Sequence, residues 1–172
     1  MTTIPYQNEI VSAANQNNIP PSILAGVLDQ ESGFNANARN VNKVNGQPVS
    51  VDQGIAQINN KAHPDVSSTQ ANNPGYAIPY AASLLSNYYQ TCGNWTGALE
   101  KYNSGKCSGD TGYASSVLSK ANQYGFLDSG NTGANGSTGP SWLNPLESGM
   151  VKYGLIGIVI VFGFLFIMNG LG

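Results

Sequence analysis

Charge is scarce in this sequence. Charged residues make up 9% of its 172 residues, whereas typical globular domains contain roughly 25%. The net charge is −2, and the seven lysines and arginines are scattered along the chain. Binding to nucleic acid by neutralising phosphates requires a dense basic patch, so we expect no nucleic-acid partner. The polar surface must come from Asn, Gln, Ser, Thr and Tyr, which suit both sugar binding and an ordinary soluble surface.

Metal ligands are equally few. His63 is the single histidine, and the two cysteines, Cys92 and Cys107, do not form a Cys-x-x-Cys pair. A zinc site needs about four ligands, so we expect no metal site. The cysteines leave two alternatives. One is a disulfide that closes a loop of about 15 residues and adds ~3 kcal/mol under the chain-entropy model; the other is a pair of buried free thiols.

The two ends of the chain differ in hydropathy. Residues 1–6 contain no basic stretch and no apolar run, so we expect no cleavable signal peptide. Residues 153–172 carry no charge, and residues 155–168 are apolar apart from glycines. Twenty helical residues span about 30 Å, the thickness of one hydrocarbon core. The sequence therefore predicts a transmembrane helix at 151–172, with a buried helix or an oligomerisation segment as the alternative.

Four segments within the first 125 residues or so have apolar residues at helical spacing. The first opens at Pro21 and ends at Gly33, the second follows Asn73, and the third starts at Asn94. Pro79 lies early in the second segment and would kink that helix or delay its start. The four apolar stripes are Ile23, Leu24, Val27 and Leu28; Ala77, Ala81, Leu84, Leu85 and Tyr88; Trp95, Ala98, Leu99 and Tyr102; and Ala114, Val117, Leu118 and Ala121.

The chain between the first two helical segments has a different pattern. Residues 41–51 contain Asn45-Gly46 flanked by valines, which predicts a β-hairpin. After Leu127 the composition changes to Gly, Ser, Asn and Thr, which is typical of a flexible linker. We therefore predict a mainly α-helical domain with a small β-hairpin at 1–127. A linker and juxtamembrane segment at 128–150 and one transmembrane helix at 151–172 would follow.

Glu31 is the first candidate for catalysis. It follows Val27 by four positions and Leu28 by three, which places it on or beside the apolar face of its helix. Desolvation at such a position disfavours the charged form of a carboxyl group and raises its pKa. A carboxyl group that stays protonated can give its proton to a leaving oxygen. The alternative is a glutamate in the last helical turn that points into solvent.

Four short motifs follow one another along the chain. Glu31–Ala38 begins with a Glu-Ser pair, Gly54–Asn59 reads Gly-Ile-Ala-Gln-Ile-Asn, Asn73–Ile78 opens a helical segment, and Ala98–Gly105 contains Tyr-Asn-Ser-Gly. In this order they resemble the motifs of the soluble lytic transglycosylase family of the lysozyme-like superfamily, over about residues 10–125. The resemblance implies a lysozyme-like α+β fold and an enzyme that cleaves peptidoglycan. One departure is Asn40, where family members often carry a serine nine positions after the glutamate.

The resemblance implies a role for each matching residue. Glu31 would be the sole catalytic acid and base, Gln57 would bind the sugar, and Asn103 would help to shape the floor of the site. Tyr102 would donate a hydrogen bond near Glu31, although periodicity alone also allows a place in the core. The alternative to sugar binding by Gln57 is that it is an ordinary exposed residue of a strand. The substrate-binding candidates are Ser32, Gln57, Asn59, Tyr102 and Asn103.

Asp52 leaves two chemistries open. The stretch Ser50–Asn59 also resembles the active-site strand of animal-type lysozymes, in which an Asp at this position is the second carboxylate. A retaining hydrolase needs that partner about 5 Å from the acid. A lytic transglycosylase needs none, because its glutamate protonates the glycosidic oxygen and then deprotonates the muramoyl 6-hydroxyl, which closes a 1,6-anhydro ring. The Glu-Ser pair and the Tyr-Asn-Ser-Gly motif favour the transglycosylase.

Neither of these two chemistries requires a metal or an organic cofactor. A third alternative from another class is a non-catalytic glycan-binding or virion structural protein on the same scaffold, and the presence of Glu31 argues against it. For Asp52 itself, a further alternative is that it merely caps the turn before Gly54. A zymogram against purified cell wall separates the catalytic from the non-catalytic alternatives.

The predicted location has an internal conflict. Lys152 is the only charge close to the apolar segment and lies on its N-terminal side, so the positive-inside rule would keep the domain in the cytoplasm. A membrane-anchored enzyme carried in a phage particle would reach peptidoglycan during entry. The alternative is a cell-encoded enzyme at the bacterial inner membrane, facing the periplasm, that opens the wall for a secretion or conjugation apparatus. The expected partners are glycan strands, a membrane, and other virion or envelope-machine proteins.

Overall fold

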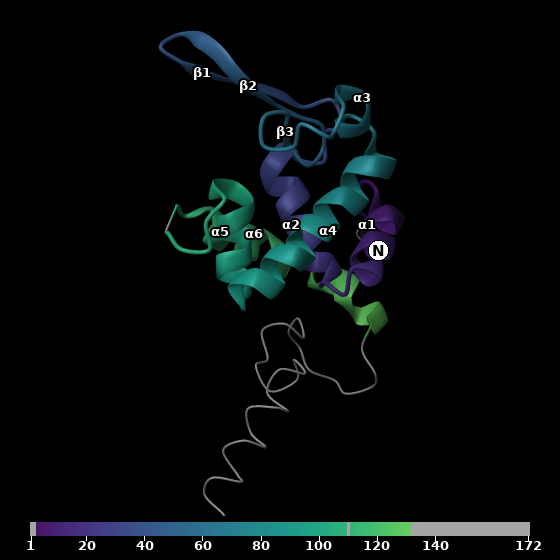
Figure 1. The fold of residues 1–172 in the computed structure, drawn as a ribbon. Coiled ribbons are helices and arrows are strands. Elements are labelled where there is room, and N and C mark those ends of the chain that lie inside the picture. The colour runs from purple at the N-terminus through teal and green to yellow at the C-terminus, as the bar shows by residue number, and fades with distance from the viewer. Residues whose placement is uncertain (1–2, 110, 132–172) are drawn as a thin grey trace, which may run out of the picture. The chain divides into compact units, whose positions relative to one another are not determined.

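A computed structural model of the chain describes residues 3–109 and 111–131. Five long helices pack together, and three short strands lie at one end of them (Figure 1). The elements in chain order are α1 (Gln7–Gln16), α2 (Pro21–Ser32), β1 (Arg39–Val44), β2 (Gln47–Gln53), β3 (Ile58–Asn59), α3 (Ser68–Ala71), α4 (Pro74–Cys92), α5 (Trp95–Ser104), α6 (Tyr113–Gln123) and the 3-10 helix η1 (Gly125–Asn131). The predicted mainly helical domain with a small β-hairpin is confirmed, and the hairpin belongs to a three-stranded antiparallel sheet.

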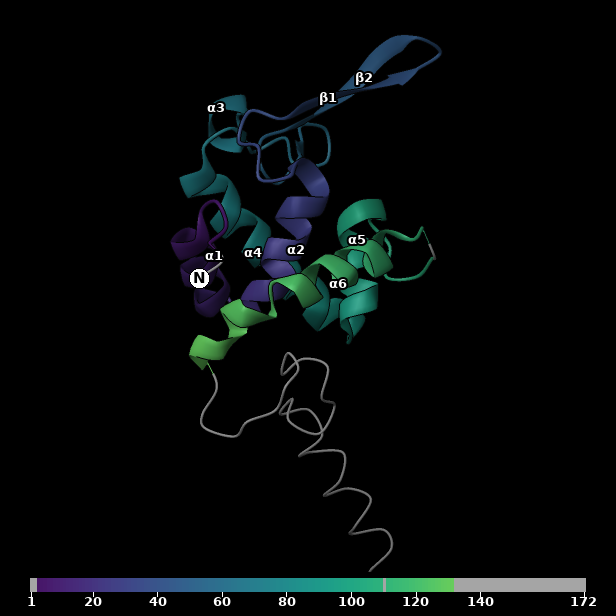
Figure 2. The ribbon, with the colours of Figure 1, turned by 180° about the vertical axis from the view of Figure 1, so that it is seen from behind.

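Helix α2 is the central helix of the core. Every residue from Pro21 to Leu28 is buried, because α1, α4 and α6 all pack against it. In the view from behind, α6 lies across α2, and η1 continues from it past α1 (Figure 2). The helix begins at a proline, whose missing N–H would be unsatisfied there in any case, and ends at Gly33 in the left-handed conformation, as predicted.

The sheet has the order β1-β2-β3, and both strand pairs are antiparallel. Asn45 and Gly46 both have positive φ, 50° and 78°, which fits the tight hairpin turn that this dipeptide predicts. The third strand, β3, lies in the stretch Ser50–Asn59 that resembles an active-site strand, but it was not predicted as a separate strand. It pairs Ile58 with Gln53 and Asn59 with Asp52, and so brings two predicted site residues side by side.

The remaining predicted helices are also present, with two differences. Helix α4 begins at Pro74, so Pro79 within it does not delay its start. Leu84 and Tyr88 belong to the apolar stripe of α4 but are only half-buried, because they face a cavity instead of the core. Helix α1 was not predicted individually, and it buries only Ile10, Ala13 and Ala14.

The last described segment, η1, is tied to the start of α2. Asp128 is 5% exposed, and its two oxygens accept hydrogen bonds from the backbone N–H of Ser22 (2.9 Å) and from its hydroxyl (2.7 Å). These hydrogen bonds tie Asp128 to the helical domain, although the predicted domain boundary comes just before it, after residue 127. The boundary itself stays a prediction. The helix predicted at 151–172 lies outside the described residues. No helix in residues 3–109 and 111–131 has the length and apolarity that a membrane crossing requires.

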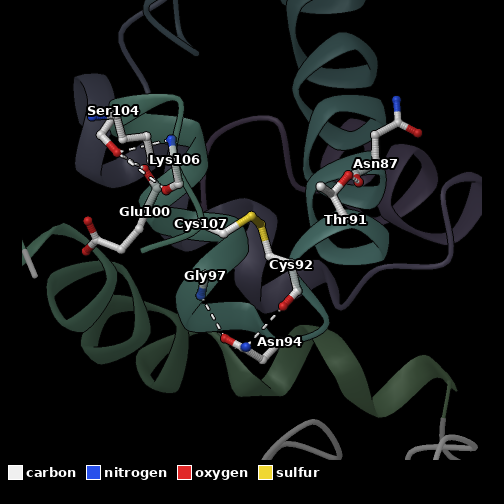
Figure 3. Close-up of a disulfide and its surroundings, with 9 residues drawn as sticks. All are labelled: Asn87, Thr91, Cys92, Asn94, Gly97, Glu100, Ser104, Lys106 and Cys107. Carbon is white, nitrogen blue, oxygen red and sulfur yellow. Dashed lines mark hydrogen bonds between the residues drawn. A yellow bond between two sulfur atoms is a disulfide. The ribbon is translucent and has the colours of Figure 1, made fainter. Parts of the chain in front are cut away.

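Cys92 and Cys107 form a disulfide that joins the end of α4 to the loop between α5 and α6 (Figure 3). The Cα atoms of the pair are 5.5 Å apart. Between the two cysteines, Asn94 caps α5 by accepting a hydrogen bond from the backbone N–H of Gly97 (2.8 Å), as its position before Trp95 predicted. The end of α4, the start of α5 and the loop before α6 are therefore held together.

Candidate active site

A cavity of about 820 Å³ lies where the sheet meets the helices. Its walls come from the end of α2, the strands β1, β2 and β3, the turn between β2 and β3, the loop after β3, and one face each of α4 and α5. Of the predicted site residues, Glu31, Asp52, Gln57, Asn59, Tyr102 and Asn103 line this cavity. Segments far apart in the sequence thus bring nearly all the candidates to one place.

Glu31 occupies the last turn of α2, at the inner wall of the cavity. Burial raises the pKa of its carboxyl group to about 7, the hydrogen bond from Tyr113 acts in the opposite direction, and the charge of Asp52 adds to the rise. Removal from water penalises the charged form, and one hydroxyl donor does not compensate for that loss. Glu31 is therefore close to half protonated at neutral pH, which suits a group that must both give and take a proton.

Tyr113 is the residue that contacts Glu31 most directly, and the sequence reasoning missed it. Its hydroxyl donates a hydrogen bond of 2.5 Å to Glu31 Oε1. Burial and the neighbouring Glu31 charge raise the pKa of Tyr113 far above its ordinary value, so the phenol remains a donor at any working pH. A signal was available, because Tyr113 precedes Val117 by four positions and shares the apolar face of α6.

Glu100 fixes the start of α6 and with it Tyr113. Glu100 is 2% exposed. Its carboxylate accepts hydrogen bonds from the hydroxyl of Thr111 (2.8 Å) and from the backbone N–H of Ala114 (3.1 Å). The backbone bond to Ala114, followed by the Thr111 bond, lowers the pKa of Glu100. A carboxylate at a helix N-terminus is also favoured by the partial positive charge of the helix end. Glu100 was not predicted as a functional residue.

Ser32 and Gln57 shape the turn that faces Glu31. The Ser32 hydroxyl lies within hydrogen-bonding distance of two carbonyls, those of Ile55 (2.7 Å) and Leu28 (3.2 Å). Ser32 therefore links the end of α2 to the turn. Gln57 lies in this turn with φ +46° and donates to the Gly54 carbonyl (2.9 Å). Gly54 has φ +75°, and a Cβ there would meet the Ala71 carbonyl oxygen at 1.8 Å, so only glycine fits. Gln57 is therefore a half-buried turn residue, not an exposed strand residue.

Tyr102 and Asn103 line the cavity from α5. The predicted hydrogen bond of Tyr102 goes to the Ala56 carbonyl (2.9 Å), while Glu31 is close enough for its charge to raise the pKa of Tyr102 further, after burial. Tyr102 therefore fastens α5 to the turn that carries Gln57. Asn103 is exposed, and its amide donates to the Thr111 hydroxyl (3.2 Å). Its predicted part in the floor of the site stays a prediction.

Asp52 lies on β2 among amide side chains. Its Oδ2 accepts hydrogen bonds from Asn42 (2.8 Å) and Asn40 (3.1 Å), and its Oδ1 accepts one from Asn59 (2.6 Å). Asn40 occupies the position where the family often has a serine, and here its amide serves Asp52. Asn59 also donates to Ser50 (3.1 Å), so its role as a direct sugar ligand stays a prediction.

The comparisons with known proteins agree with this geometry. A family model described as "Transglycosylase SLT domain" matches residues 8–123, about two thirds of the chain. The chain belongs to this transglycosylase family. Membership implies a peptidoglycan lytic transglycosylase, and the matched range contains every residue of the cavity.

Two curated relatives extend the comparison. The chain is similar to the proteins named "Protein IpgF" of Shigella flexneri and Shigella sonnei, with 36% identity over 104 residues in both cases. The alignment covers 54% of this chain and 62% of each relative, so the chain spans less than two thirds of the relatives' length. No solved structure matches the chain significantly.

Proposed function

We propose that this SLT domain cleaves the β-1,4 bond between N-acetylmuramic acid and N-acetylglucosamine in peptidoglycan and leaves a 1,6-anhydro muramoyl end. The observation that carries the proposal is Glu31, a carboxyl group with a pKa of about 7 at the wall of a large polar cavity. A single group near half protonation can serve both proton transfers of the reaction.

The reaction needs two proton transfers and no water. Protonated Glu31 gives its proton to the glycosidic oxygen as the bond to the anomeric carbon of the muramoyl unit breaks, and the N-acetylglucosamine unit leaves with a new hydroxyl. The Glu31 carboxylate then takes the proton of the muramoyl 6-hydroxyl, whose oxygen bonds to the anomeric carbon. Glu31 ends protonated, ready for another cycle. Tyr113, which donates to Oε1, orients the carboxyl group and stabilises its charged form between the two transfers.

The alternative is hydrolysis of the same bond with Asp52 as the second carboxylate. The charge of Asp52 raises the pKa of Glu31, so the two carboxyl groups lie near each other in the cavity wall. Three amide donors engage the two oxygens of Asp52, however, which favours a role in holding the strands and the cavity wall. We therefore assign the ring closure to the substrate's own hydroxyl.

Mass spectrometry of the digestion products tests the proposal. We expect muropeptides that end in 1,6-anhydromuramic acid, and we expect Asp52→Asn to keep producing them at a substantial rate. Because this substitution places an amide against three amide donors, lost activity alone would not separate a structural from a catalytic role. Product identity does: a dominant reducing muramic acid end from the wild-type protein would mean that water attacks, and the enzyme would then be a lysozyme.

The cellular setting is also part of the proposal. Both curated relatives are from Shigella, and their bacterial source favours a cell-encoded enzyme that opens the wall locally over an enzyme carried in a phage particle. Attachment to the inner membrane through residues 151–172, with the domain facing the periplasm, would hold it near its substrate. Membrane fractionation of the full chain, beside a variant without residues 151–172, tests this: equal recovery in the soluble fraction would argue against the anchor.

A further inference from the structure

One face of α4 carries large side chains at intervals of four residues. Tyr76, Tyr80, Leu84 and Tyr88 are all half-exposed, whereas Ala77, Ala81 and Leu85 on the neighbouring face are fully buried. Leu84 and Tyr88 line the catalytic cavity. Tyr80 and Tyr76 are not among its lining residues, and they lie about one and two turns before Leu84, closer to the start of the helix. The same aromatic face therefore continues beyond the cavity.

His63 connects the two parts of this face. It lines the cavity from the loop after β3, and its Nδ1 lies 2.9 Å from the Tyr80 hydroxyl. The His63 and Tyr80 rings meet edge to face with centroids 5.5 Å apart, and Tyr76 stacks on Tyr80 at 5.8 Å with 17° between the planes. The three rings are thus held in place before any ligand arrives, which lowers the entropy cost of binding.

The chemistry of this cluster suits a neutral sugar. A tyrosine offers an apolar ring with a polar tip, and a pyranose offers a flat C–H face rimmed by hydroxyls. Four helical residues rise about 6 Å, which is similar to the length of one sugar unit. Burial and the charge of Asp65 both raise the pKa of Tyr80, so its hydroxyl stays neutral. Asp65 also disfavours the carboxylates of the peptide stems, and the stacked tyrosine rings favour the flat face of a sugar.

We propose that Tyr76, Tyr80 and His63 form an additional glycan-binding site, which adjoins the catalytic cavity at His63 and extends beyond it, and on which sugar rings of the same strand stack. The site rests on the proposed function, because it receives the part of the strand that extends from the bond being cleaved. It makes the enzyme favour long strands over short ones and contributes to substrate binding rather than to the chemical step.

Binding of peptide-free glycan strands of increasing length to the full chain tests the site. The Glu31→Gln background prevents cleavage during the measurement. Tyr76→Ala should weaken the binding of long strands by roughly 3- to 10-fold, the range that one aromatic contact gives, and leave the shortest strands unaffected. Tyr76→Phe should bind like the parent. Phe126→Ala is the matched control, since it removes an aromatic ring that is 42% exposed on η1.

A second variant guards against misfolding. Tyr76→Leu keeps apolar bulk and helix propensity but removes the flat ring, and it should show the same loss for long strands. Equal binding by parent, Tyr76→Ala and Tyr76→Leu at every strand length would overturn the site while leaving the cleavage proposal intact. A loss confined to strands that carry peptides would also overturn it, because the ligand would then be the peptide stem. Absence of any cleavage by the wild-type protein would overturn the proposed function and this site with it.

Discussion

Glu31 is half-buried and Glu100 is buried, and the pKa values of these two carboxyl groups move in opposite directions. Glu31 is the less buried of the two, yet burial raises its pKa to about 7. Glu100 is only 2% exposed, and its pKa is lowered. Desolvation is the largest influence on the pKa of Glu31, whereas hydrogen bonds outweigh desolvation at Glu100. The difference lies in the hydrogen-bond donors: Glu31 receives the Tyr113 hydroxyl, whereas Glu100 receives a backbone N–H at a helix start and a hydroxyl.

One helix, α6, contacts both the proposed catalytic carboxyl group, Glu31, and a structural one, Glu100. Its first residue, Tyr113, donates to Glu31, and its second, Ala114, donates its N–H to Glu100. A backbone donor at a helix N-terminus stabilises a negative charge strongly. The single hydroxyl of Tyr113 does not offset the loss of water around Glu31, so the pKa of Glu31 stays raised. A raised pKa keeps the proton available that general acid catalysis requires.

The largest expected effect comes from Glu31→Gln. The amide keeps the shape of the side chain but cannot deliver a proton, so lysis of purified cell wall should fall by about 10²- to 10⁴-fold, and further because the same group also acts as the base. Circular dichroism should show an unchanged fold. A folded Glu31→Gln protein that still lyses the wall would remove Glu31 from the mechanism.

The same substitution should also change stability, in a direction opposite to the loss of activity. Because the folded-state pKa of Glu31 is raised from 4.5 to about 7, ionisation of this group weakens the fold progressively as the pH rises through that range. Glu31→Gln removes this penalty, so its Tm should exceed that of the wild type at pH 8 and match it near pH 4. Thermal melts across this range measure the difference, and a lower Tm for the variant at pH 8 would contradict the raised pKa.

Tyr113→Phe should have the next largest effect. Loss of the Tyr113 donor to Oε1 should reduce kcat by about 10-fold, the equivalent of one charge-assisted hydrogen bond. Since the Tyr113 bond lowers the pKa of Glu31, its removal should also move the basic limb of the pH–activity profile to higher pH. Tyr124→Phe is the control, because that hydroxyl donates to Asp29 instead (2.7 Å). A basic limb that stays in place would mean that Tyr113 does not influence Glu31.

Glu100→Gln should affect stability first and activity second. The lowered pKa of Glu100 contributes stability that is present above the ordinary pKa of a glutamate and is lost as the pH falls through its folded-state value. The variant should therefore melt several degrees below the wild type at pH 7, and the gap should close in acid. A basic limb shifted in the same direction as in Tyr113→Phe would show that the loosened start of α6 releases Glu31. A Tm gap that is constant with pH would rule out the charge of Glu100 as the cause.

The smallest effect concerns Asp128, a further buried carboxyl group at a helix start. A fragment that ends at residue 131 should fold and cleave peptidoglycan, whereas one that ends at 127 loses both hydrogen bonds to Ser22 and should melt at a lower temperature with nearly the same activity. Melting curves of the two fragments give the comparison. Equal Tm values would show that the domain ends at 127, as the composition predicted.

Much of the fold could be predicted from the sequence because its signals are local. The apolar stripe between Pro21 and Gly33 predicted the core helix α2, and Asn45-Gly46 predicted the hairpin. Glu31 could be found because a carboxyl group beside an apolar stripe is unusual and because the surrounding motif is specific. Each of these signals lies within a few residues of the element that it predicts.

The rest depends on contacts between distant segments. The bond between Tyr113 and Glu31 joins residues 82 positions apart, and no local pattern distinguishes such a tyrosine from a core residue. In the sequence, Glu100 has the pattern of an ordinary charged residue on an amphipathic helix. Its structural role depends on its contacts with the start of α6, which is distant in the sequence. Leu84 and Tyr88 were assigned to the core, since a stripe that faces a cavity has the same spacing as one that faces another helix.

The bridge between Cys92 and Cys107 has a consequence for where the enzyme reaches its full form. Thiols stay reduced in the cytosol of most organisms, and disulfides form in oxidising compartments such as the periplasm. The loop that the bridge holds leads directly into Thr111 and the start of α6, which carry the donors for Glu100 and Glu31. We therefore expect the proposed catalytic carboxyl group to be less firmly held in a reducing compartment, where the bridge is open, than in an oxidising one, where it is closed.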